Sequence, residues 1–229
     1  MTRLRRYCPA GIPVHIIQRG NNRSDCFYDE ADKGYYFQLL KTGAESFDLH
    51  VHAWIFMSNH VHLLVTPMES DSVSRMMQFV DREYVRYFNR KYSRTGTLWD
   101  GRFKSCLVQA ERYFLICQRY IELNPVRAGL VNEPAMFHWS TYNTNALGIE
   151  SSLASPHEVY LALGDTKARR LAAYRALFNE TIPDQQISEV RFALNKGLAL
   201  GSKGFKDRIA KEGGQRTRLG KRGRKPSLS

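Results

Sequence analysis

Residues 57–65 read MSNHVHLLV and give the first indication of how this chain folds. Side chains of a β-strand alternate between two faces, so His60 and His62 share one face, and the apolar residues at the odd-numbered positions line the other. Two imidazoles two residues apart on a rigid strand converge on one point, which is the geometry that a divalent cation requires. The same pair is equally typical of a half-buried strand whose histidines are satisfied by hydrogen bonds, so the rest of the chain must distinguish these interpretations.

Hydrophobic spacing around this stretch predicts the order strand, helix, strand, strand, helix, strand. The predicted strands are 14–19, 49–56, 60–65 and about 98–109, and the predicted helices are about 29–46 and 72–92. Residues 57–59 are too few for anything but a hairpin turn, so the strands on either side of them pair antiparallel. The order is that of the split βαβ, or ferredoxin-like, arrangement, an α+β fold with one antiparallel sheet and helices on one face. We expect the histidine strand at its centre, with an exposed, flat polar face.

The strand before the turn carries a second candidate pair, His50 and His52. If Phe56 lies opposite His60, then Trp54 and His52 share the face of the first pair. We expect the metal at His60 and His62, because a central strand beside a tight turn fixes the backbone best. The second pair lies on an edge strand, where His52 is at most a neighbour of the site.

The charge and composition of the chain restrict its class. It has 229 residues, which fits one medium domain with an appendage, and its net charge of +12 predicts a polyanionic partner such as nucleic acid. Its four cysteines form no C-x-x-C pair, which indicates free thiols in a reducing compartment. We find no apolar run of membrane-spanning length and no secretory h-region, so we expect a cytoplasmic, nucleoid-associated protein and no membrane partner.

A further helix is predicted from residue 110 to 123, where Asn124 and Pro125 end it. Tyr120 and Asn124 are four residues apart and project from the same helix face. For an arbitrary helix, the ordinary interpretation would be a core tyrosine and a C-terminal cap.

Four segments carry a resemblance to a known family. They are GIPVHIIQRGN at 11–21, MSNHVHLLV at 57–65, WDGRFK at 99–104 and YIELNPVRAGL at 120–130. The second resembles the HUH motif (histidine, hydrophobic, histidine) of the single-tyrosine, IS200-like transposases, and the last is similar to the tyrosine-helix signature of that family. The other two resemble its first and last strands. Together, over roughly residues 5–145, they resemble the branch called REP-associated tyrosine transposases.

The resemblance implies a role for each matching residue. His60 and His62 would bind Mg²⁺ or Mn²⁺, and Asn124, where many relatives have Gln, would supply a third ligand. Tyr120 would be the nucleophile that attacks a DNA phosphodiester, giving a 5′-phosphotyrosine and a free 3′-OH. The implied enzyme is an HUH single-tyrosine transposase that nicks and rejoins single-stranded DNA at a REP-like palindromic hairpin. It would act as a monomer or homodimer, with the tyrosine serving its own chain or that of a partner.

Basic and aromatic residues near the predicted strands are candidates for DNA contacts. The candidates are Arg19, Asn21, Arg23, Trp99, Arg102, Phe103 and Lys104 in the core, and Lys221, Arg222, Arg224 and Lys225 in the tail. Trp54 and Phe56 are further candidates for stacking on unpaired bases. A solvated strand face is nearly as good an interpretation of each basic residue taken alone.

We predict three parts in the chain. Residues 1–145 form the catalytic domain, 146–202 a helical extension, and 203–229 a basic, glycine-rich tail that is disordered alone and binds DNA. In the extension, Ser155 to Glu158 resemble a capping box, and further helices are predicted near 171–178 and 190–198.

Two other classes of function remain open from the residues. A non-catalytic nucleic-acid-binding module on an RRM-like sheet would need neither metal nor Tyr120. A metal-dependent hydrolase would use His60 and His62 to activate water and would form no covalent adduct.

Overall fold

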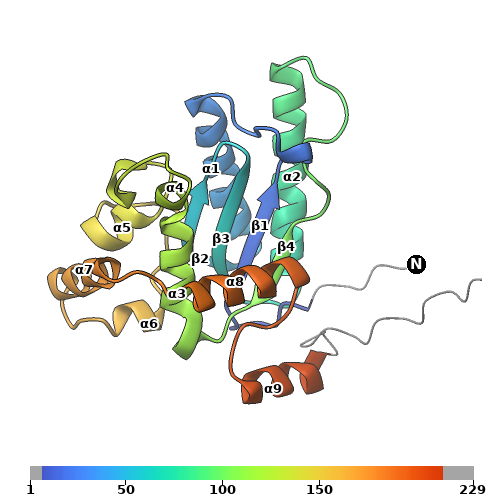
Figure 1. Ribbon diagram of the computed structural model, residues 1–229. Coiled ribbons are helices and arrows are strands. Elements are labelled where there is room, and N and C mark those ends of the chain that lie inside the picture. Colours follow the sequence, from blue (N-terminus) through green and yellow to red (C-terminus); the bar gives the residue numbers. More distant parts are fainter. Residues whose placement is uncertain (1–6, 214–229) are drawn as a thin grey trace, which may run out of the picture.

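The computed structural model describes residues 7–213 and contains one four-stranded antiparallel sheet with the strand order β2-β3-β1-β4. The strands are β1 (Val14–Arg19), β2 (Leu49–Phe56), β3 (His60–Pro67) and β4 (Lys104–Leu107). Between them run helices α1 (Glu30–Ser46) and α2 (Ser72–Lys91), on one face of the sheet (Figure 1). The predicted α+β, split βαβ topology is confirmed, and β3 lies at the centre of the sheet beside β1.

The face under α1 and α2 holds the first hydrophobic core, which is rich in aromatic rings. Tyr36 of α1 packs edge-on against Tyr84 of α2, with 4.9 Å between ring centroids, and both contact Phe56 or Phe27 beneath them. The two helices are also joined at one end. Asp29 and Asp32 form a capping box at the start of α1, and Lys91 at the end of α2 forms ion pairs with both carboxylates.

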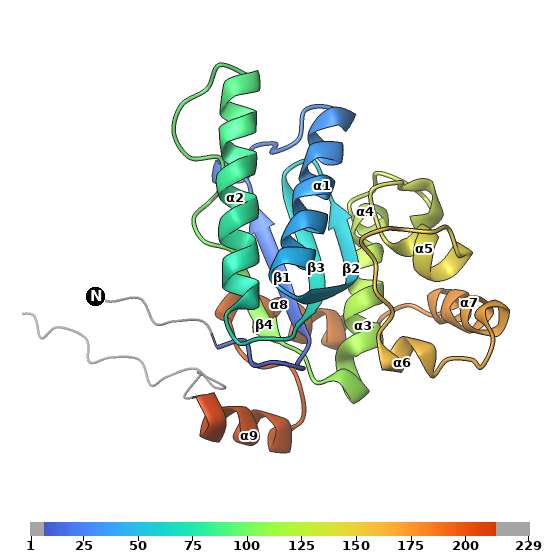
Figure 2. The ribbon, with the colours of Figure 1, turned by 180° about the vertical axis from the view of Figure 1, so that it is seen from behind.

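The opposite face of the sheet, which carries the histidines, is covered as well. Up to residue 213, where the described part of the chain ends, seven further helices follow β4: α3 (Ala110–Glu122), α4 (Asn124–Arg127), α5 (Tyr142–Leu147), α6 (Glu158–Leu161), α7 (Lys167–Ala176), α8 (Asp184–Lys196) and α9 (Lys203–Gly213). Short 3-10 helices occupy Asn21–Arg23, Pro134–Met136 and Leu177–Asn179. Helix α3 packs on β2 and β3, and α8 packs on β4 (Figures 1 and 2).

The expected flat, exposed histidine face is therefore wrong, since His62 is only 2% exposed. The apolar stripe of α3, which includes Phe114, Cys117 and Ile121, forms a second core with the strand residues on this face. Burial of that stripe provides the driving force that closes the face.

The pairing of β2 with β3 differs from our expectation by one residue. Ile55 lies opposite His62 and Phe56 opposite Val61, so Trp54 and Phe56 point into the first core. A bulge between Val51 and Ala53 then changes the register by one residue, so that the pairing from Val51 back to Leu49 differs from that nearer the turn. The predicted stacking of bases on Trp54 and Phe56 is therefore wrong, because both side chains are buried under α1.

The last strand is shorter than predicted and spans only residues 104–107. Gly101, with φ of +95°, turns the segment before it away from a regular strand. The segment still follows the end of β1, because Asp100 donates its backbone N–H to Arg19 O and Asn21 donates to Leu98 O.

The extension contains helices close to the positions predicted for them, but its first cap differs. His157, not Ser155, accepts the hydrogen bond from the Val159 N–H at the start of α6. Ser155 instead donates its backbone N–H to Val51 O of β2.

Residues Lys203–Gly213 form helix α9, so the beginning of the predicted disordered tail is helical. The tail candidates Lys221, Arg222, Arg224 and Lys225 lie outside the described residues. Among residues 7–213, none of the helices is long and apolar enough to cross a membrane.

Candidate active site

Three imidazoles meet on the α3 face of the sheet. His60 and His62 project from β3 with 5.2 Å between their ring centroids. His15 comes from β1, where antiparallel pairing places it opposite Leu64 and therefore on the same face as both. Its Nε2 atom lies 3.0 Å from Nδ1 of His62. Our sequence analysis missed His15, although the predicted adjacency of the first and third strands, with alternation, could have placed it there.

Tyr120 reaches this cluster from the last turn of α3. Its ring centroid lies 5.9 Å from that of His62 and 5.7 Å from that of His15. The side chain is 6% exposed. The structure therefore places Tyr120, the predicted nucleophile, next to His62 in the same chain. His60, the other predicted histidine ligand, lies beside His62.

The hydrogen bond of His60 determines which of its nitrogens can bind a metal. The Asn59 amide donates from Nδ2 to Arg23 O at 3.2 Å, so its oxygen faces His60. Nδ1 of His60, 2.6 Å from that oxygen, must then be the protonated nitrogen. This leaves the lone pair on Nε2, in the pattern of a metal-binding histidine held by an outer partner.

His62 fits the same pattern in one of its two tautomers. If its Nδ1–H donates to His15 Nε2, its own Nε2 carries a lone pair for a cation. Burial, followed by the charge of Arg19, lowers the pKa of His60 to about 4, and burial lowers that of His62 well below its usual value. Both rings are therefore neutral at neutral pH, as metal ligation requires.

Asn124, the predicted third ligand, begins α4. Its Nδ2 donates to the backbone oxygen of Tyr120 at 3.4 Å, which is a weak capping contact with the end of α3. Within residues 7–213, no three His, Cys, Asp or Glu side chains form a metal-binding cluster. His60 and His62 each offer one imidazole nitrogen of the type that a cation binds, and metal binding by these histidines and by Asn124 stays a prediction.

The second histidine pair has a different role. His52 uses both ring nitrogens in structural contacts, with Ser155 O at 2.7 Å and with Thr66 Oγ1 at 2.8 Å. His50 is exposed on the edge strand. His52 thus joins the extension to the sheet.

A basic rim, made of Arg19, Arg102 and Lys104, borders the histidine face. All three side chains are exposed, and together they line a small cavity of about 40 Å³. Arg19 lies opposite His60, and Lys104 lies opposite Ile17, so both share the histidine face. The two other basic-loop candidates, Asn21 and Arg23, occupy the 3-10 helix just beyond β1.

The aromatic candidates of the last segment are not available for stacking. Trp99 and Phe103 are 5% and 6% exposed and belong to the first core. Their predicted contact with unpaired bases is wrong, because the loop before β4 turns both rings inward.

Glu122 is a buried carboxyl group that our sequence analysis did not single out. It accepts hydrogen bonds from Tyr174 Oη at 2.8 Å, and from Thr141 Oγ1 and Asn145 Nδ2 at 2.9 Å each. Burial raises its pKa to about 7, and the three donors oppose that shift. Because Glu122 is two residues from Tyr120, this network fixes the end of α3 against α5 and α7.

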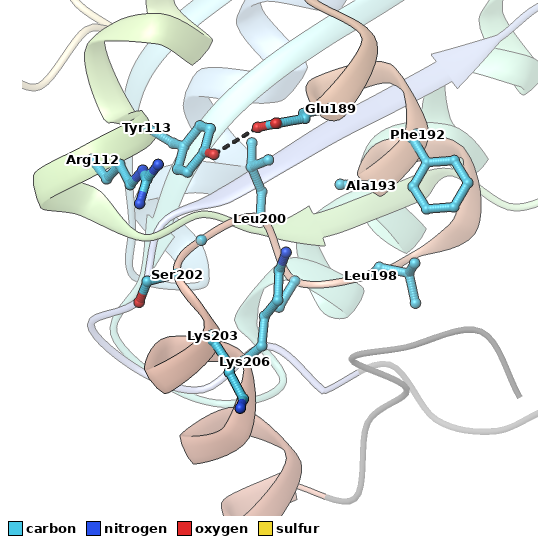
Figure 3. Close-up of a pocket in the computed structure, with 12 residues that line it drawn as sticks. Arg112, Tyr113, Glu189, Phe192, Ala193, Leu198, Leu200, Ser202, Lys203 and Lys206 are labelled. Carbon is cyan, nitrogen blue, oxygen red and sulfur yellow. Dashed lines mark hydrogen bonds between the residues drawn. The ribbon is translucent and has the colours of Figure 1, made fainter. Parts of the chain in front are cut away.

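A separate cavity of about 650 Å³ lies among α3, α8 and α9 (Figure 3). Tyr113 and Glu189 meet across it in a 2.6 Å hydrogen bond, and Lys203 and Lys206 of α9 line its lower part. Neither the histidines nor Tyr120 line this cavity, so the imidazole–phenol site is a distinct feature.

Comparison with known proteins identifies the family. The family model described as "Transposase IS200 like" matches residues 10–124, about half of the chain. A solved structure of a REP-associated tyrosine transposase bound to a REP hairpin is 20% identical, covers 73% of this chain and 96% of its own, and has a TM-score of 0.52. A putative transposase from Deinococcus radiodurans R1 is 26% identical over 53% of this chain and 96% of its own, with a TM-score of 0.37. No curated protein matches. From the family match, the chain belongs to the IS200-like transposases.

Proposed function

We propose that this protein nicks and rejoins single-stranded DNA through a covalent phosphotyrosine, with Tyr120 as the nucleophile. The observation that carries the proposal is the distance of 5.9 Å between the rings of Tyr120 and His62 in one chain. Membership of a transposase family and the net charge of +12 support DNA as the substrate.

The reaction exchanges one phosphodiester for another. The Tyr120 oxygen attacks the phosphorus in line, the bond from phosphorus to the 3′ oxygen breaks, and the phenol proton leaves to solvent as the 3′-OH is protonated. The product is a 5′-phosphotyrosine, which conserves the energy of the broken ester. A second 3′-OH can then attack it, release Tyr120 and join the strands without ATP.

His60 and His62 would hold Mg²⁺ or Mn²⁺ through their Nε2 atoms, with Asn124 as a further ligand. When bound, the cation neutralises a non-bridging oxygen of the phosphate and orients it for attack. The neutral imidazoles leave its remaining coordination positions for DNA and water.

The substrate we propose is a single-stranded hairpin of the REP type, and the branch is that of the REP-associated tyrosine transposases. The similar fold of a protein solved with a REP hairpin supports this choice. Arg19, Arg102 and Lys104 would track the backbone beside the site, since exposed Arg and Lys on one rim neutralise phosphates.

The experiment uses hairpin oligonucleotides with single-stranded flanks and a 3′ label, incubated with the protein and Mn²⁺ or Mg²⁺. We expect a labelled protein band on a denaturing gel, which Tyr120→Phe abolishes. Tyr113→Phe is the matched control, because Tyr113 lies on the same helix two turns earlier and should retain the band.

Two results would contradict the proposal. Cleavage without an attached protein would indicate a hydrolase in which water attacks. Binding without cleavage would indicate a non-catalytic nucleic-acid-binding module.

A further inference from the structure

Arg127 lies directly over the predicted nucleophile. Helix α3 ends at Glu122, and the single turn of α4, with Pro125 near its start, returns the chain so that Arg127 faces α3. Its guanidinium carbon is 4.3 Å from the centroid of the Tyr120 ring. One terminal nitrogen, Nη2, donates to the backbone oxygen of Tyr120.

The other two nitrogens of this guanidinium have no partner. Nε and Nη1 are both buried, and neither forms a hydrogen bond within the part of the chain that the structure describes. A buried donor without an acceptor loses its hydrogen bonds to water and destabilises the protein, more so when it is charged. Such a group is therefore a strong candidate for completion by a ligand.

The described part of the chain provides no anionic partner for Arg127, which lies close to the imidazoles. Among residues 7–213, no carboxylate forms an ion pair with Arg127. The Tyr120 ring that Arg127 covers lies 5.7 Å from the ring of His15 and 5.9 Å from that of His62, so the guanidinium lies close to the histidine cluster. These two groups lie on different edges of the planar guanidinium, because Nη1 is cis to Cδ and the Nε–H points to the other edge. Either of them can donate a charged hydrogen bond to a phosphate oxygen, and bonds of this kind are strong.

We infer that Arg127 is a catalytic residue that donates an unpaired guanidinium N–H to the scissile phosphate beside Tyr120. This inference rests on the function proposed above and adds a second positive group to it. In the attack of Tyr120 on phosphorus, negative charge grows on the non-bridging oxygens until the 3′ oxygen leaves. A preorganised cation at those oxygens stabilises that state more than the ground state.

A purely structural role makes a different prediction. The Nη2 bond to Tyr120 O caps the end of α3, and that contact is indifferent to the charge of the substrate. A substrate whose scissile phosphate is a methylphosphonate separates the two roles, because it lacks the negative charge that Arg127 would neutralise.

The experiment compares the wild-type protein, Arg127→Gln and Arg127→Lys on a hairpin DNA with either a phosphodiester or a methylphosphonate at the mapped nick site. Release of the 5′-labelled 3′-OH strand is measured at saturating DNA, and hairpin affinity is measured separately. On the phosphodiester, Arg127→Gln should slow release about 100-fold or more, with Arg127→Lys intermediate. On the methylphosphonate, Arg127→Gln and wild-type should release the strand at rates within about threefold of each other.

The control is Arg169→Gln, which changes an exposed arginine of α7 paired with Asp165 and should leave both rates unchanged. Unfolding midpoints of all variants show whether each is folded. An equal deficit of Arg127→Gln on both substrates, or no deficit on either, would overturn the inference while the phosphotyrosine mechanism stands. Failure of the wild-type protein to form any adduct would instead refute the proposed function, and the role of Arg127 with it.

Discussion

The two faces of the sheet are built from alternate residues of the same strands, yet they differ in chemistry. Toward α1 and α2 the strands present Ile16, Leu63 and Phe56, which pack into an aromatic core. Toward α3 they present His15 and His62, which are just as deeply buried.

Burial of imidazoles provides less stability than burial of apolar groups of similar size, because each ring nitrogen must find a partner. The apolar face therefore supplies most of the stability of the fold. The histidine face contributes less, because it holds a polar site. Residues outside the strands follow the same division, since Tyr120, Glu122 and Arg127 all lie on the second side.

The largest effect expected from changing the second face is the loss of His62. His62→Ala should reduce Mn²⁺ affinity strongly and slow adduct formation about 1000-fold, since a cation supplies several kcal/mol of transition-state stabilisation. Titration calorimetry with Mn²⁺ and the gel assay measure the two effects. His52→Ala is the matched control, a buried histidine of the same face whose nitrogens are both used structurally. Equal Mn²⁺ binding by His62→Ala and wild-type would disprove the ligand role.

On the first face, Phe56→Ala should act on stability alone. The ring is fully buried against Phe27 and Tyr36, so its removal should lower the free energy of unfolding by about 3–5 kcal/mol. Urea denaturation measures this change. The adduct rate per folded molecule should stay at the wild-type value, and a specific loss of rate would show that the two faces are coupled.

His15 should have an intermediate effect, because it acts through His62. His15→Leu removes the acceptor for the His62 Nδ1–H and should weaken Mn²⁺ affinity about 10–100-fold. His15→Gln can place its amide oxygen near the former Nε2 and should recover part of that affinity. If both variants bind Mn²⁺ as wild-type does, His15 has only a packing role.

The smallest effect is a pH dependence of stability in which the buried histidines of the second face, His52 among them, and one buried carboxyl group oppose each other. Burial lowers the pKa of His52 from 6.5 to about 4, so the unfolded chain binds more protons and stability falls as pH falls from 6.5 to 4. Burial raises the pKa of Glu122 from 4.5 to about 7, so its contribution is lost as pH rises through that range. Glu122→Gln should therefore make stability rise more steeply with pH than in wild-type. Urea midpoints from pH 4.5 to 7, without metal, test this, and an unchanged slope would contradict it.

Local patterns were sufficient to predict the topology of the sheet. Alternation marked β1, β2 and β3, a three-residue gap determined the hairpin, and the four-residue spacing of Tyr120 and Asn124 placed both on one helix face. These features depend on residues close together in sequence, for which periodicity is a direct signal.

The errors arose in the register of the hairpin and where distant segments decide. The tight turn, in which Met57 donates its backbone N–H to His60 O, pairs Phe56 with Val61 and not with His60, and this difference of one residue turns Trp54 and Phe56 to the opposite face. The closure of the histidine face by α3, and the return of Arg127 over Tyr120, depend on how the chain folds back after β4. No local sequence pattern predicts that path.

The placement of Tyr120 and His62 in one polypeptide has a consequence for the proposed reaction in a population of molecules. Each copy should cut independently, with an initial velocity proportional to protein concentration down to high dilution. Mixing a copy that lacks the phenol with a copy that lacks the imidazole should not restore any cutting. A DNA element that must be severed at both ends would then require two copies, or one copy acting twice in succession.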